Sequence, residues 1–397
     1  MTRNAEQFAF EAPERYFLGP DDEFVVRPDC RHFKGGLPCK FWRPCSGCDE
    51  YSPVGRRYLL IMLGLFGDML IASPLPPRIK LDHPDCHVTW LCDEAHVPLM
   101  EMNPGVDRVL AYSWETVRQL EREKFHAIYS FERTPGAAAL METVDAVERA
   151  GLAYGGPSSA LYPVGRAAEH FFKMNTWNDH RTTLNSKTWT ELYFEVAGYD
   201  YRGEPYRLNV PEPAREKARV DRRQFGTSNI IGFNLGSSLA TKMWPTEHWI
   251  DLGHRLLSET AKDLGIWLFA GGKEHGMANE IAAALRVNAP GRVHYRPLPL
   301  PEFCAAIDMC DVVVTGDTFG YHLALLYEKP TVVLFGPSPV AEVVPKHAKR
   351  LQILTSKLAC SPCAHQVACG GVGGCMGAIS VTDVLSATTA QLDLCHP

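Results

Sequence analysis

The sequence predicts an α/β protein in which two Rossmann-like, doubly wound domains face each other across a cleft. Short apolar runs alternate with helix-like segments in two series, one starting near Arg57 and the other at Ile230, and this alternation is typical of parallel βαβ units. A length of 397 residues is enough for two or three domains. Ligands of doubly wound domains bind at the carboxyl ends of the strands, so we expect the chemistry to lie at strand-to-helix turns.

The composition divides the chain into four segments. Residues 1–52 are polar, irregular and rich in Pro, Gly and Cys, which indicates a Cys-rich N-terminal extension without a core of its own. Residues 53–209 form the predicted first domain. The run Val210-Pro211-Glu212-Pro213 is typical of a linker, so residues 210–376 form the predicted second domain and residues 377–397 a C-terminal segment.

The elements of the first domain follow from its apolar runs and the segments between them. A late helix is expected to begin at Asn185 or Ser186, either of which can cap it, and to end at Ala197, where Gly198 supplies a stop. The predicted strands are Tyr58–Leu63, Val88–Cys92, Arg108–Ala111 and His126–Phe131, and the other predicted helices include Trp114–Lys124 and Ala137–Ala150.

The second domain repeats the alternation after a charged helix. Its apolar runs are again short and are separated by segments of helical length, which predicts a second parallel sheet. The predicted strands are Ile230–Asn234, Ile266–Ala270, Val312–Thr315 and Thr331–Phe335, and the predicted helices are Ala214–Arg223, Thr246–Ser258, His275–Arg286, Pro301–Cys310 and Thr318–Tyr327.

Charge and hydropathy disfavour several classes of protein. The chain has 40 Lys and Arg against 46 Asp and Glu, a formal net charge of −6, and lacks the broad cationic character that nucleic-acid binding requires. Residues Met1–Glu14 lack the apolar region of a secretory signal. The most apolar stretch, Tyr58–Pro77, is interrupted by Asp68 and by prolines, which argues against a membrane span. We therefore expect a cytoplasmic protein.

The first strand-to-helix turn contains Gly64, Gly67 and Asp68. Glycines there permit close approach of the backbone. Asp68 at the start of a helix has two interpretations. It can cap the free amides of the first turn, or it can act as a general base at the mouth of the cleft.

The second turn follows the strand that ends at Asn234. Its small hydroxyl residues, Ser237 and Ser238, can donate hydrogen bonds to phosphate oxygens, and Lys242 adds a positive charge. The turn therefore has the composition of an anion site. The alternative is a polar loop with one solvated lysine.

The third turn runs from Gly316 to His322. A helix starting near Thr318 would point its free amides and the positive end of its dipole at the cleft, a favourable position for a diphosphate. His322 lies four residues after Thr318, one helical turn along the same face. His322 could reach the same ligand, or it could be a structural residue of an apolar helix.

Taken together and in order, these motifs resemble glycosyltransferase family nine, the ADP-heptose:lipopolysaccharide heptosyltransferases and their relatives. Each motif alone is weak, and the combination is specific. The matching features are the Gly67-Asp68 turn, the block of Lys242, Trp244, Pro245, His248 and Trp249, the turn Gly271–Glu274, Asp317-Thr318 with His322, and Leu334–Pro337.

The resemblance implies the GT-B fold, with an acceptor-side first domain, a nucleotide-sugar donor domain second, and a C-terminal segment that crosses back to the first domain. It implies that Asp68 deprotonates the acceptor hydroxyl and that Lys242 stabilises the leaving nucleoside diphosphate. The donor would be bound by Ser237 and Ser238 at its diphosphate, by Glu274 at its ribose, and by Asp317, Thr318 and His322 at its sugar or phosphates.

The implied reaction is an inverting transfer, with an ADP-heptose as the expected donor and a lipopolysaccharide core or another glycan at the inner membrane face as acceptor. No Asp-x-Asp motif is found, so no catalytic metal is expected, and Lys242, hydroxyl groups and helix dipoles would stabilise the leaving group. The chain departs from the family at Phe319, where the family commonly has glycine. The alternative function is a non-catalytic nucleotide-sugar-binding or assembly protein with metal-stapled cysteine modules.

Thirteen cysteines are many for a cytoplasmic protein. Two sets of four are closely spaced, and each contains a Cys-x-x-Cys, which indicates a structural Zn²⁺ or iron–sulfur cluster, at two separate sites or at one shared site. A redox protein built on an iron–sulfur cluster is a third hypothesis for the function. Cys86, Cys92, Cys304 and Cys310 lie in apolar patterns and are expected to be buried. The N-terminal set is Cys30, Cys39, Cys45 and Cys48, and the C-terminal set is Cys360, Cys363, Cys369 and Cys375.

Overall fold

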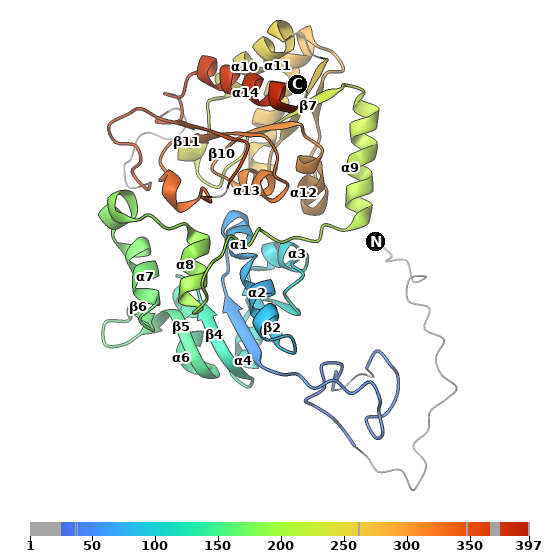
Figure 1. The fold of residues 1–397 in the computed structure, drawn as a ribbon, viewed down its shortest axis with the longest axis vertical. Coiled ribbons are helices and arrows are strands. Elements are labelled where there is room, and N and C mark those ends of the chain that lie inside the picture. Colours follow the sequence, from blue (N-terminus) through green and yellow to red (C-terminus); the bar gives the residue numbers. More distant parts are fainter. Residues whose placement is uncertain are drawn as a thin grey trace.

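The computed structural model of the chain describes residues 25–35, 37, 39–260, 263–346, 348–365 and 374–395. Two six-stranded sheets, each with helices packed on its faces, form two domains that lie one above the other in Figure 1. The prediction of two doubly wound α/β domains that face each other is confirmed.

The first sheet has the strand order β3-β2-β1-β4-β5-β6. Neighbouring strands are parallel except β5 and β6, which pair antiparallel. The order reverses at β1, so the turn after β1 lies at a switch point of the topology, where ligands bind in such sheets. The strands are β1 Arg57–Ile61, β2 His87–Cys92, β3 Arg108–Ala111, β4 Lys124–Ser130, β5 Asp145–Gly155 and β6 Ala160–Val164.

Helices cover both faces of this sheet because its central strand is apolar on both sides. Leu60 of β1 packs in the core that contains α1 and α8, whereas Leu59 and Ile61 pack in the core on the opposite face. The helices are α1 Phe66–Ala72, α2 Leu75–Asp82, α3 Val97–Met100, α4 Trp114–Leu120, α5 Pro135–Ala138, α6 Leu140–Thr143, α7 Ala168–Thr176 and α8 Trp189–Val196.

The second sheet has the order β12-β11-β10-β7-β8-β9, and all its strands are parallel. The order reverses at β7, beside β10, so the turns after these two strands lie at the switch point. The strands are β7 Asn229–Asn234, β8 Leu264–Phe269, β9 Val293–Tyr295, β10 Val312–Gly316, β11 Thr331–Phe335 and β12 Leu351–Thr355; the helices are α9 Glu212–Phe225, α10 Thr246–Glu259, α11 His275–Asn288, α12 Leu300–Asp308, α13 Phe319–Leu326 and α14 Val381–Cys395.

The predicted helix Ala137–Ala150 is largely wrong. Only the short helices α5 and α6 form there, and from Asp145 the chain is strand β5. Gly151 allows this strand to lie close to β4, because a Cβ at that position would come within 2.0 Å of the carbonyl oxygen of Ser130. Pairing with β4 therefore determines the structure of residues 145–150, and local helix propensity does not.

Helix α8 begins later than the sequence predicted. Thr188 caps it through a capping box, in which the backbone of Glu191 donates to the Thr188 hydroxyl (3.2 Å) and the backbone of Thr188 donates to the Glu191 carboxylate (2.7 Å). Asn185 instead forms a turn with Lys187, whose backbone N–H donates to the Asn185 side chain (3.1 Å). The predicted cap at Asn185 or Ser186 is therefore wrong, although the predicted end at Ala197 is confirmed.

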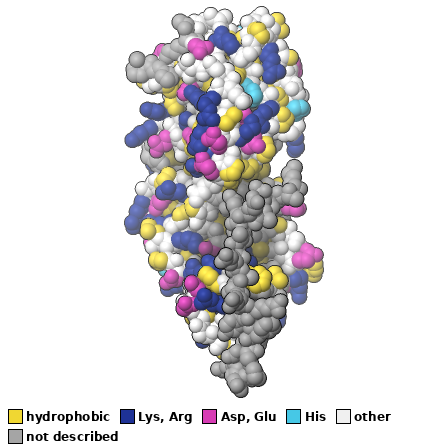
Figure 2. Space-filling view, turned by 90° about the vertical axis from the view of Figure 1, so that its right-hand side faces the viewer, with side chains coloured by type: hydrophobic (Ala, Val, Ile, Leu, Met, Phe, Trp, Pro, Cys, Tyr) yellow, Lys and Arg dark blue, Asp and Glu magenta, His cyan; other side chains and the backbone are white. Residues whose placement is uncertain are grey.

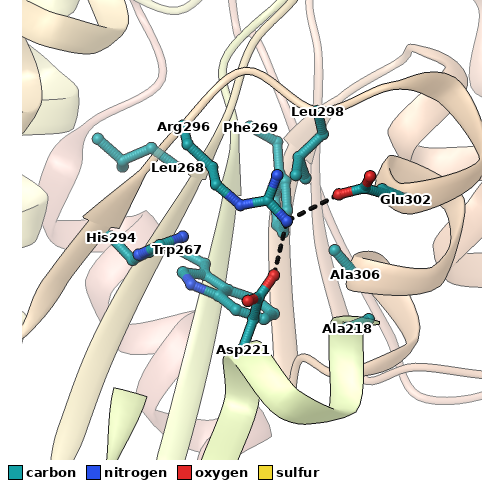
Figure 3. A pocket seen from close by; sticks show the side chains of 10 residues that line it. All are labelled: Ala218, Asp221, Trp267, Leu268, Phe269, His294, Arg296, Leu298, Glu302 and Ala306. Atoms are coloured by element: carbon teal, nitrogen blue, oxygen red, sulfur yellow. Dashed lines mark hydrogen bonds and ion pairs between the residues drawn. The ribbon is translucent and has the colours of Figure 1, made fainter. Parts of the chain in front are cut away.

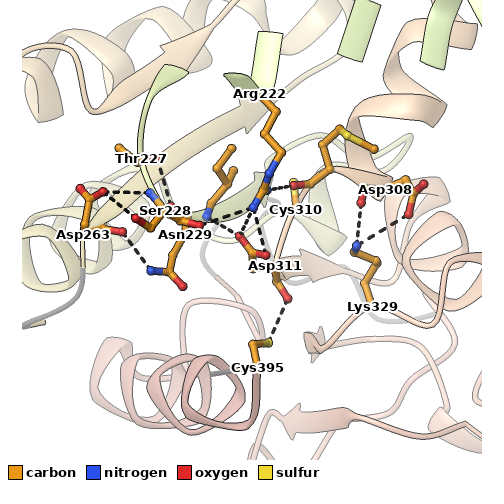
Figure 4. Close-up of polar contacts among 12 residues, drawn as sticks. Arg222, Thr227, Ser228, Asn229, Asp263, Asp308, Cys310, Asp311, Lys329 and Cys395 are labelled. Carbon is orange, nitrogen blue, oxygen red and sulfur yellow. Dashed lines mark hydrogen bonds and ion pairs between the residues drawn. The ribbon is translucent and has the colours of Figure 1, made fainter. Parts of the chain in front are cut away.

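In its described part, residues 377–395, the C-terminal segment stays on the second domain. Helix α14 packs against α10 and the second sheet, and Val384 and Leu392 are buried in the core of that domain. The thiol of Cys395 donates to the backbone carbonyl of Asp311 (3.4 Å; Figure 4). The expected crossing to the first domain is wrong for these residues, because the apolar side chains of α14 complete the second core.

Two groups of partly buried polar contacts hold α9 to the second domain. Asp311, just before β10, accepts hydrogen bonds from the backbone of Ile230 (2.7 Å) and from the guanidinium of Arg222 (3.1 Å; Figure 4). Arg296 bridges Asp221 of α9 (2.6 Å) and Glu302 of α12 (2.8 Å; Figure 3). Both groups of contacts therefore have a structural role that fixes the helix after the linker.

The described part of the N-terminal extension lies beside the first domain, at the end of the sheet away from the second domain (Figure 1). Cys30 forms an isolated β-bridge with Pro53, and the Arg31 guanidinium donates to the carbonyl of Asp85 before β2 (3.3 Å). These contacts attach the extension to the amino ends of β1 and β2, which are remote from the switch point.

The surface shown in Figure 2 carries mixed charge. Lys and Arg side chains are interspersed with Asp and Glu over the described part of this face, as expected from the net charge of −6. No helix within the described ranges is long and apolar enough to cross a membrane.

Candidate active site

One cavity between the two domains is lined by all eight residues that were predicted to act in catalysis or donor binding. Its volume is about 520 Å³, in the range of small-molecule sites. The start of α1 lines it from the first domain, and the turns after β7, β8 and β10 line it from the second. Their placement together is a structural finding, and their individual roles stay predictions. The residues are Asp68, Ser237, Ser238, Lys242, Glu274, Asp317, Thr318 and His322.

Asp68 lies in the first turn of α1, where its side chain is partly buried in the cavity. Burial is the main cause that raises the pKa of its carboxyl group to about 6; the charge of Lys242 opposes this shift and that of Asp317 adds to it. The cap residue, Leu65, has no polar side chain that can cap the helix. The negative charge of Asp68 in the first turn can therefore also stabilise the start of α1. A carboxylate with this pKa is ionised at neutral pH and basic enough to accept a proton.

Lys242 and Asp317 form an ion pair that joins the two switch-point turns. Nζ of Lys242 lies 2.6 Å from Oδ2 of Asp317 and 3.3 Å from its backbone carbonyl oxygen. Burial alone would raise the pKa of Asp317, but the charge and hydrogen bond of Lys242 outweigh it and hold the pKa at about 2. An ammonium group has three N–H donors, so after these two contacts one N–H remains for an anionic ligand in the cavity.

His322 is buried in α13 and contacts Tyr206, in the segment between α8 and α9 that connects the two domains. Its Nδ1 lies 3.4 Å from the hydroxyl of Tyr206, and its Nε2 lies 3.9 Å from Oδ1 of Asp317. Burial lowers the pKa of His322 to about 4, so the ring is neutral at pH 7. With the Tyr206 hydroxyl donating to Nδ1, the ring carries its proton on Nε2 and is a hydrogen-bond donor on the side of Asp317.

Glu274 lies in a 3₁₀ turn after β8, close to the backbone of two glycine turns. A Cβ on Gly236 would come within 3.2 Å of its Oε2, and a Cβ on Gly271 within 2.9 Å. Glycine at these positions therefore leaves the space in which the Glu274 carboxylate lines the cavity.

Thr318 is the cap residue of α13, and its hydroxyl accepts a hydrogen bond from the side-chain amide of Asn234 (2.8 Å). This bond ties the end of β7 to the start of α13. Ser237 accepts a hydrogen bond from the backbone of Leu239 (3.2 Å), and Ser238 lies beside it on the cavity wall. The two turns at the switch point are therefore held to each other by side chains.

Phe319, where the chain departs from the family pattern, packs on aromatic rings of both domains. Its ring centroid lies 5.4 Å from that of Phe66 in α1 and 5.9 Å from that of Phe303 in α12. Next to Phe66, a Cβ on Gly67 would lie 3.4 Å from the ring of His322. The bulky side chain of Phe319 is therefore part of the contact between α1 and α13.

Sequence reasoning missed the groups that join the two domains. Arg181 and Glu342 line the cavity and form an ion pair across it, and Tyr206 reaches His322 from the connector. Arg181 lies in a stretch that has no hydropathy period, and its partner is 161 positions away. A single sequence carries no signal for such a contact.

The N-terminal cysteine set lines a cavity of its own. Cys30, Cys39, Cys45 and Cys48 surround a space of about 200 Å³ together with His32. Across the described ranges, no group of three or more His, Cys, Asp or Glu side chains is arranged so that it could hold a metal ion. A metal at this set therefore stays a prediction.

The C-terminal cysteine set borders the second domain. Cys369 lies outside the described residues, Cys360 is exposed, and Cys363 and Cys375 are buried. A Cβ on Gly336, after β11, would come within 2.7 Å of the Cys375 sulfur. Because the N-terminal set lies at the far end of the first domain (Figure 1), the alternative of one shared site is wrong for the described cysteines. The predicted burial of four other cysteines is confirmed: Cys86, Cys92, Cys304 and Cys310.

Comparison with known proteins gives one family. Residues 113–370 match glycosyltransferase family 9 (heptosyltransferase). The chain is 27% identical over 140 residues to "Lipooligosaccharide heptosyltransferase 2" of Campylobacter jejuni subsp. jejuni serotype O:2, a match that covers 34% of this chain and 43% of that protein. The match thus spans less than half the length of this relative.

Two solved structures have a similar fold. "Structure of E. coli ADP-heptose lps heptosyltransferase II" superposes with a TM-score of 0.64 at 19% identity, over 85% of this chain and 99% of that one. The "iron-containing dodecameric glycosyltransferase TibC" of enterotoxigenic E. coli superposes with a TM-score of 0.52 at 13% identity, over 86% of this chain and 77% of that one. The fold predicted from the sequence, GT-B, is confirmed.

Proposed function

The chain belongs to glycosyltransferase family 9, and on that basis we propose that it moves a sugar from a nucleoside-diphosphate sugar to a hydroxyl group of a lipopolysaccharide core or another glycan. The proposed sugar is a heptose, and the proposed donor is an ADP-heptose. The names of the similar proteins from C. jejuni and E. coli support this choice.

A single observation carries the proposal. Asp68, a carboxylate of the first domain with a raised pKa, and the Lys242–Asp317 pair of the second domain line the same cavity. The first can accept a proton from an acceptor, and the second can hold an anionic leaving group. A cavity between two domains that offers both supports transfer from one bound substrate to another.

The proposed mechanism is one displacement with inversion at the anomeric carbon. Asp68 takes the proton of the acceptor hydroxyl as its oxygen forms a bond to the anomeric carbon. The bond from that carbon to the diphosphate breaks, and the electron pair leaves with the nucleoside diphosphate. The free N–H of Lys242, the hydroxyls of Ser237 and Ser238 and the N-terminal end of α13 would stabilise the charge that develops there.

The pH dependence of transfer is expected to follow Asp68. A general base must be ionised, so the rate is expected to fall as the pH drops through about 6, the raised pKa of Asp68, and to reach a plateau on the alkaline side. The measurement is kcat/KM for transfer between about pH 4.5 and 8.5. An acidic limb near pH 4, the ordinary value for a carboxyl group, would contradict the assignment.

Ligand stabilisation tests the donor, and it separates binding from turnover. A ligand that binds only the folded state stabilises it, by about 2.7 kcal/mol at 100 times its Kd. Because the proposed donor is an ADP-heptose, we expect ADP to raise the melting temperature more than UDP or GDP at the same concentration. The alternative, a non-catalytic nucleotide-sugar-binding or assembly protein, also predicts stabilisation but no turnover. An unchanged melting temperature with every nucleoside diphosphate would contradict both functions.

For the cysteine sets we propose a structural metal, Zn²⁺ or iron, outside the sugar-transfer chemistry. The four thiols that line one cavity in the extension support the choice of ligands, and the similar fold of TibC, an iron-containing glycosyltransferase, supports metal in a related fold. The described side chains are not arranged around one ion, so binding requires the loops to adjust. Metal analysis tests this proposal. Two metal ions per chain would support two separate sites, and one metal ion per chain would contradict two separate sites. A colourless protein that contains zinc would exclude an iron–sulfur redox function.

A further inference from the structure

Arg181 of the first domain and Glu342 of the second form a two-point ion pair across the cleft. Nε of Arg181 lies 2.7 Å from Oε2 of Glu342, and Nη2 lies 2.5 Å from Oε1. Both residues line the cavity that contains Asp68 and Lys242. Parallel hydrogen bonds between a guanidinium and a carboxylate fix orientation as well as distance.

The burial of this pair makes it sensitive to any separation of the domains. The side chain of Glu342 is 1% exposed and that of Arg181 is 24% exposed. Among the residues that the structure describes, Arg181 is the only one that donates a side-chain hydrogen bond to the Glu342 carboxylate. If the domains moved apart, a buried carboxylate would lose its counterion, which is strongly unfavourable.

Arg181 and Glu342 lie in two short helical turns, and the turn that holds Arg181 packs on the start of α8. Arg181 lies in the π-helical turn His180–Leu184, and its guanidinium lies over the ring of Trp189, 5.6 Å from the centroid. Trp189 is the first residue of α8, whose start is held by the capping box of Thr188. Glu342 ends the 3₁₀ turn that follows β11. The pair therefore joins the turn before α8 of the first domain to the turn after β11 of the second.

A second contact between the domains lines the same cavity. Phe66 and Gly67 of α1 meet Phe319 and His322 of α13. Asp68 follows directly in α1. One contact thus places the helix that carries Asp68 against the helix that carries His322, and the Arg181–Glu342 pair adds a polar contact with a defined direction.

We propose that Arg181 and Glu342 are a positioning pair, which sets the separation of the two domains at which Asp68 faces the Lys242–Asp317 pair. Neither residue is assigned a chemical step. The inference rests on the proposed function, because it concerns the distance between an acceptor group and a donor group. Small displacements of reacting groups lower rates strongly, so such a pair would act on kcat.

Single substitutions and a charge exchange test the pair. We expect R181M and E342Q to lower kcat for transfer by about 10- to 100-fold. The Kd for ADP, measured by calorimetry, is expected to stay within about twofold of the wild type, because neither residue is among the proposed donor-binding residues. The exchange R181E/E342R is expected to regain kcat to within about threefold of the wild type. The matched control is K346A, which breaks another ion pair between the two domains, from the exposed Lys346 to Glu191 (3.0 Å), and is expected to have little effect.

The proposal is wrong if R181M and E342Q keep wild-type kcat, or if kcat and ADP affinity fall together and the exchange restores neither. A readout without turnover separates this failure from failure of the proposed function. Small-angle scattering of the ligand-free proteins should give a larger radius of gyration for R181M and E342Q than for the wild type and K346A, with the wild-type value regained in R181E/E342R. Equal radii for all of them would overturn the pair's role even in a protein without transferase activity.

If the exchange variant does not fold, as judged by its circular dichroism, R181K takes its place. Lysine keeps the charge but loses the two-point geometry. A kcat for R181K between those of R181M and the wild type, at unchanged ADP affinity, is expected. A kcat equal to that of the wild type would mean that the two-point geometry contributes nothing to positioning, contrary to the proposal.

Discussion

Replacing Asp68 by Asn is expected to lower the rate of sugar transfer by about 10²- to 10⁴-fold, the range typical of a general base. The amide has nearly the same shape as the carboxylate but cannot accept the proton of the acceptor hydroxyl. Because the proposed role of Asp68 is chemical, the Kd for the nucleoside diphosphate should stay close to that of the wild type. Release of nucleoside diphosphate with donor and acceptor present measures the rate.

The same substitution should not destabilise the protein. Burial raises the pKa of Asp68 to about 6, so the folded state binds this proton more tightly than the unfolded state, and stability falls as the pH rises from about 4 to 6. Asn removes that cost, and at pH 7 the melting temperature of D68N is expected to equal or exceed that of the wild type. The matched control is D93N, at an exposed carboxylate that follows β2. Full transfer activity in D68N would rule out Asp68 as the base.

Replacing Lys242 by Met is expected to lower both activity and stability. Loss of a preorganised charge at the leaving group lowers kcat by about 10²- to 10³-fold. It also leaves the carboxylate of Asp317, whose side chain is 6% exposed, buried without its cation. Removal of one partner of a buried ion pair costs about 3–5 kcal/mol. Urea unfolding and steady-state kinetics measure the two effects separately.

The double variant K242M/D317N separates the two roles of Lys242. Asn in place of Asp317 removes the unpaired charge, so we expect most of the lost stability to return while kcat stays at or below that of K242M. K273M, at an exposed lysine that lines the same cavity, controls for a general loss of positive charge. Recovery of wild-type transfer in the double variant would show that Lys242 serves the fold alone.

The sequence predicted the switch-point turns because each of them is local. Asp68, Ser237 and Lys242 lie within a few residues of buried apolar strands, and the hydropathy pattern places such strands well. Parallel topology then brings their carboxyl ends together. Glu274 and His322 also follow buried strands, β8 and β10. The eight predicted residues therefore line one cavity.

The errors have a physical cause in common, which is the dominance of long-range contacts over local pattern. Residues 145–150 form a strand because β4 pairs with them, and α14 stays on the second domain because its apolar side chains complete that core. The site residues that were missed, Arg181, Glu342 and Tyr206, act through partners more than 100 positions away. No spacing rule within one sequence detects such pairs.

The most direct test of the account is turnover of ADP-heptose with lipopolysaccharide-core acceptors. The wild-type protein is incubated with donor and acceptor together and with each alone, and the release of ADP and the mass of the acceptor are followed. We predict that ADP release requires the acceptor, that the acceptor gains the mass of one heptose residue, and that D68N abolishes both. Tight binding of the donor without turnover, across panels of nucleoside-diphosphate sugars and glycan acceptors, would contradict the proposed transferase and favour a binding protein.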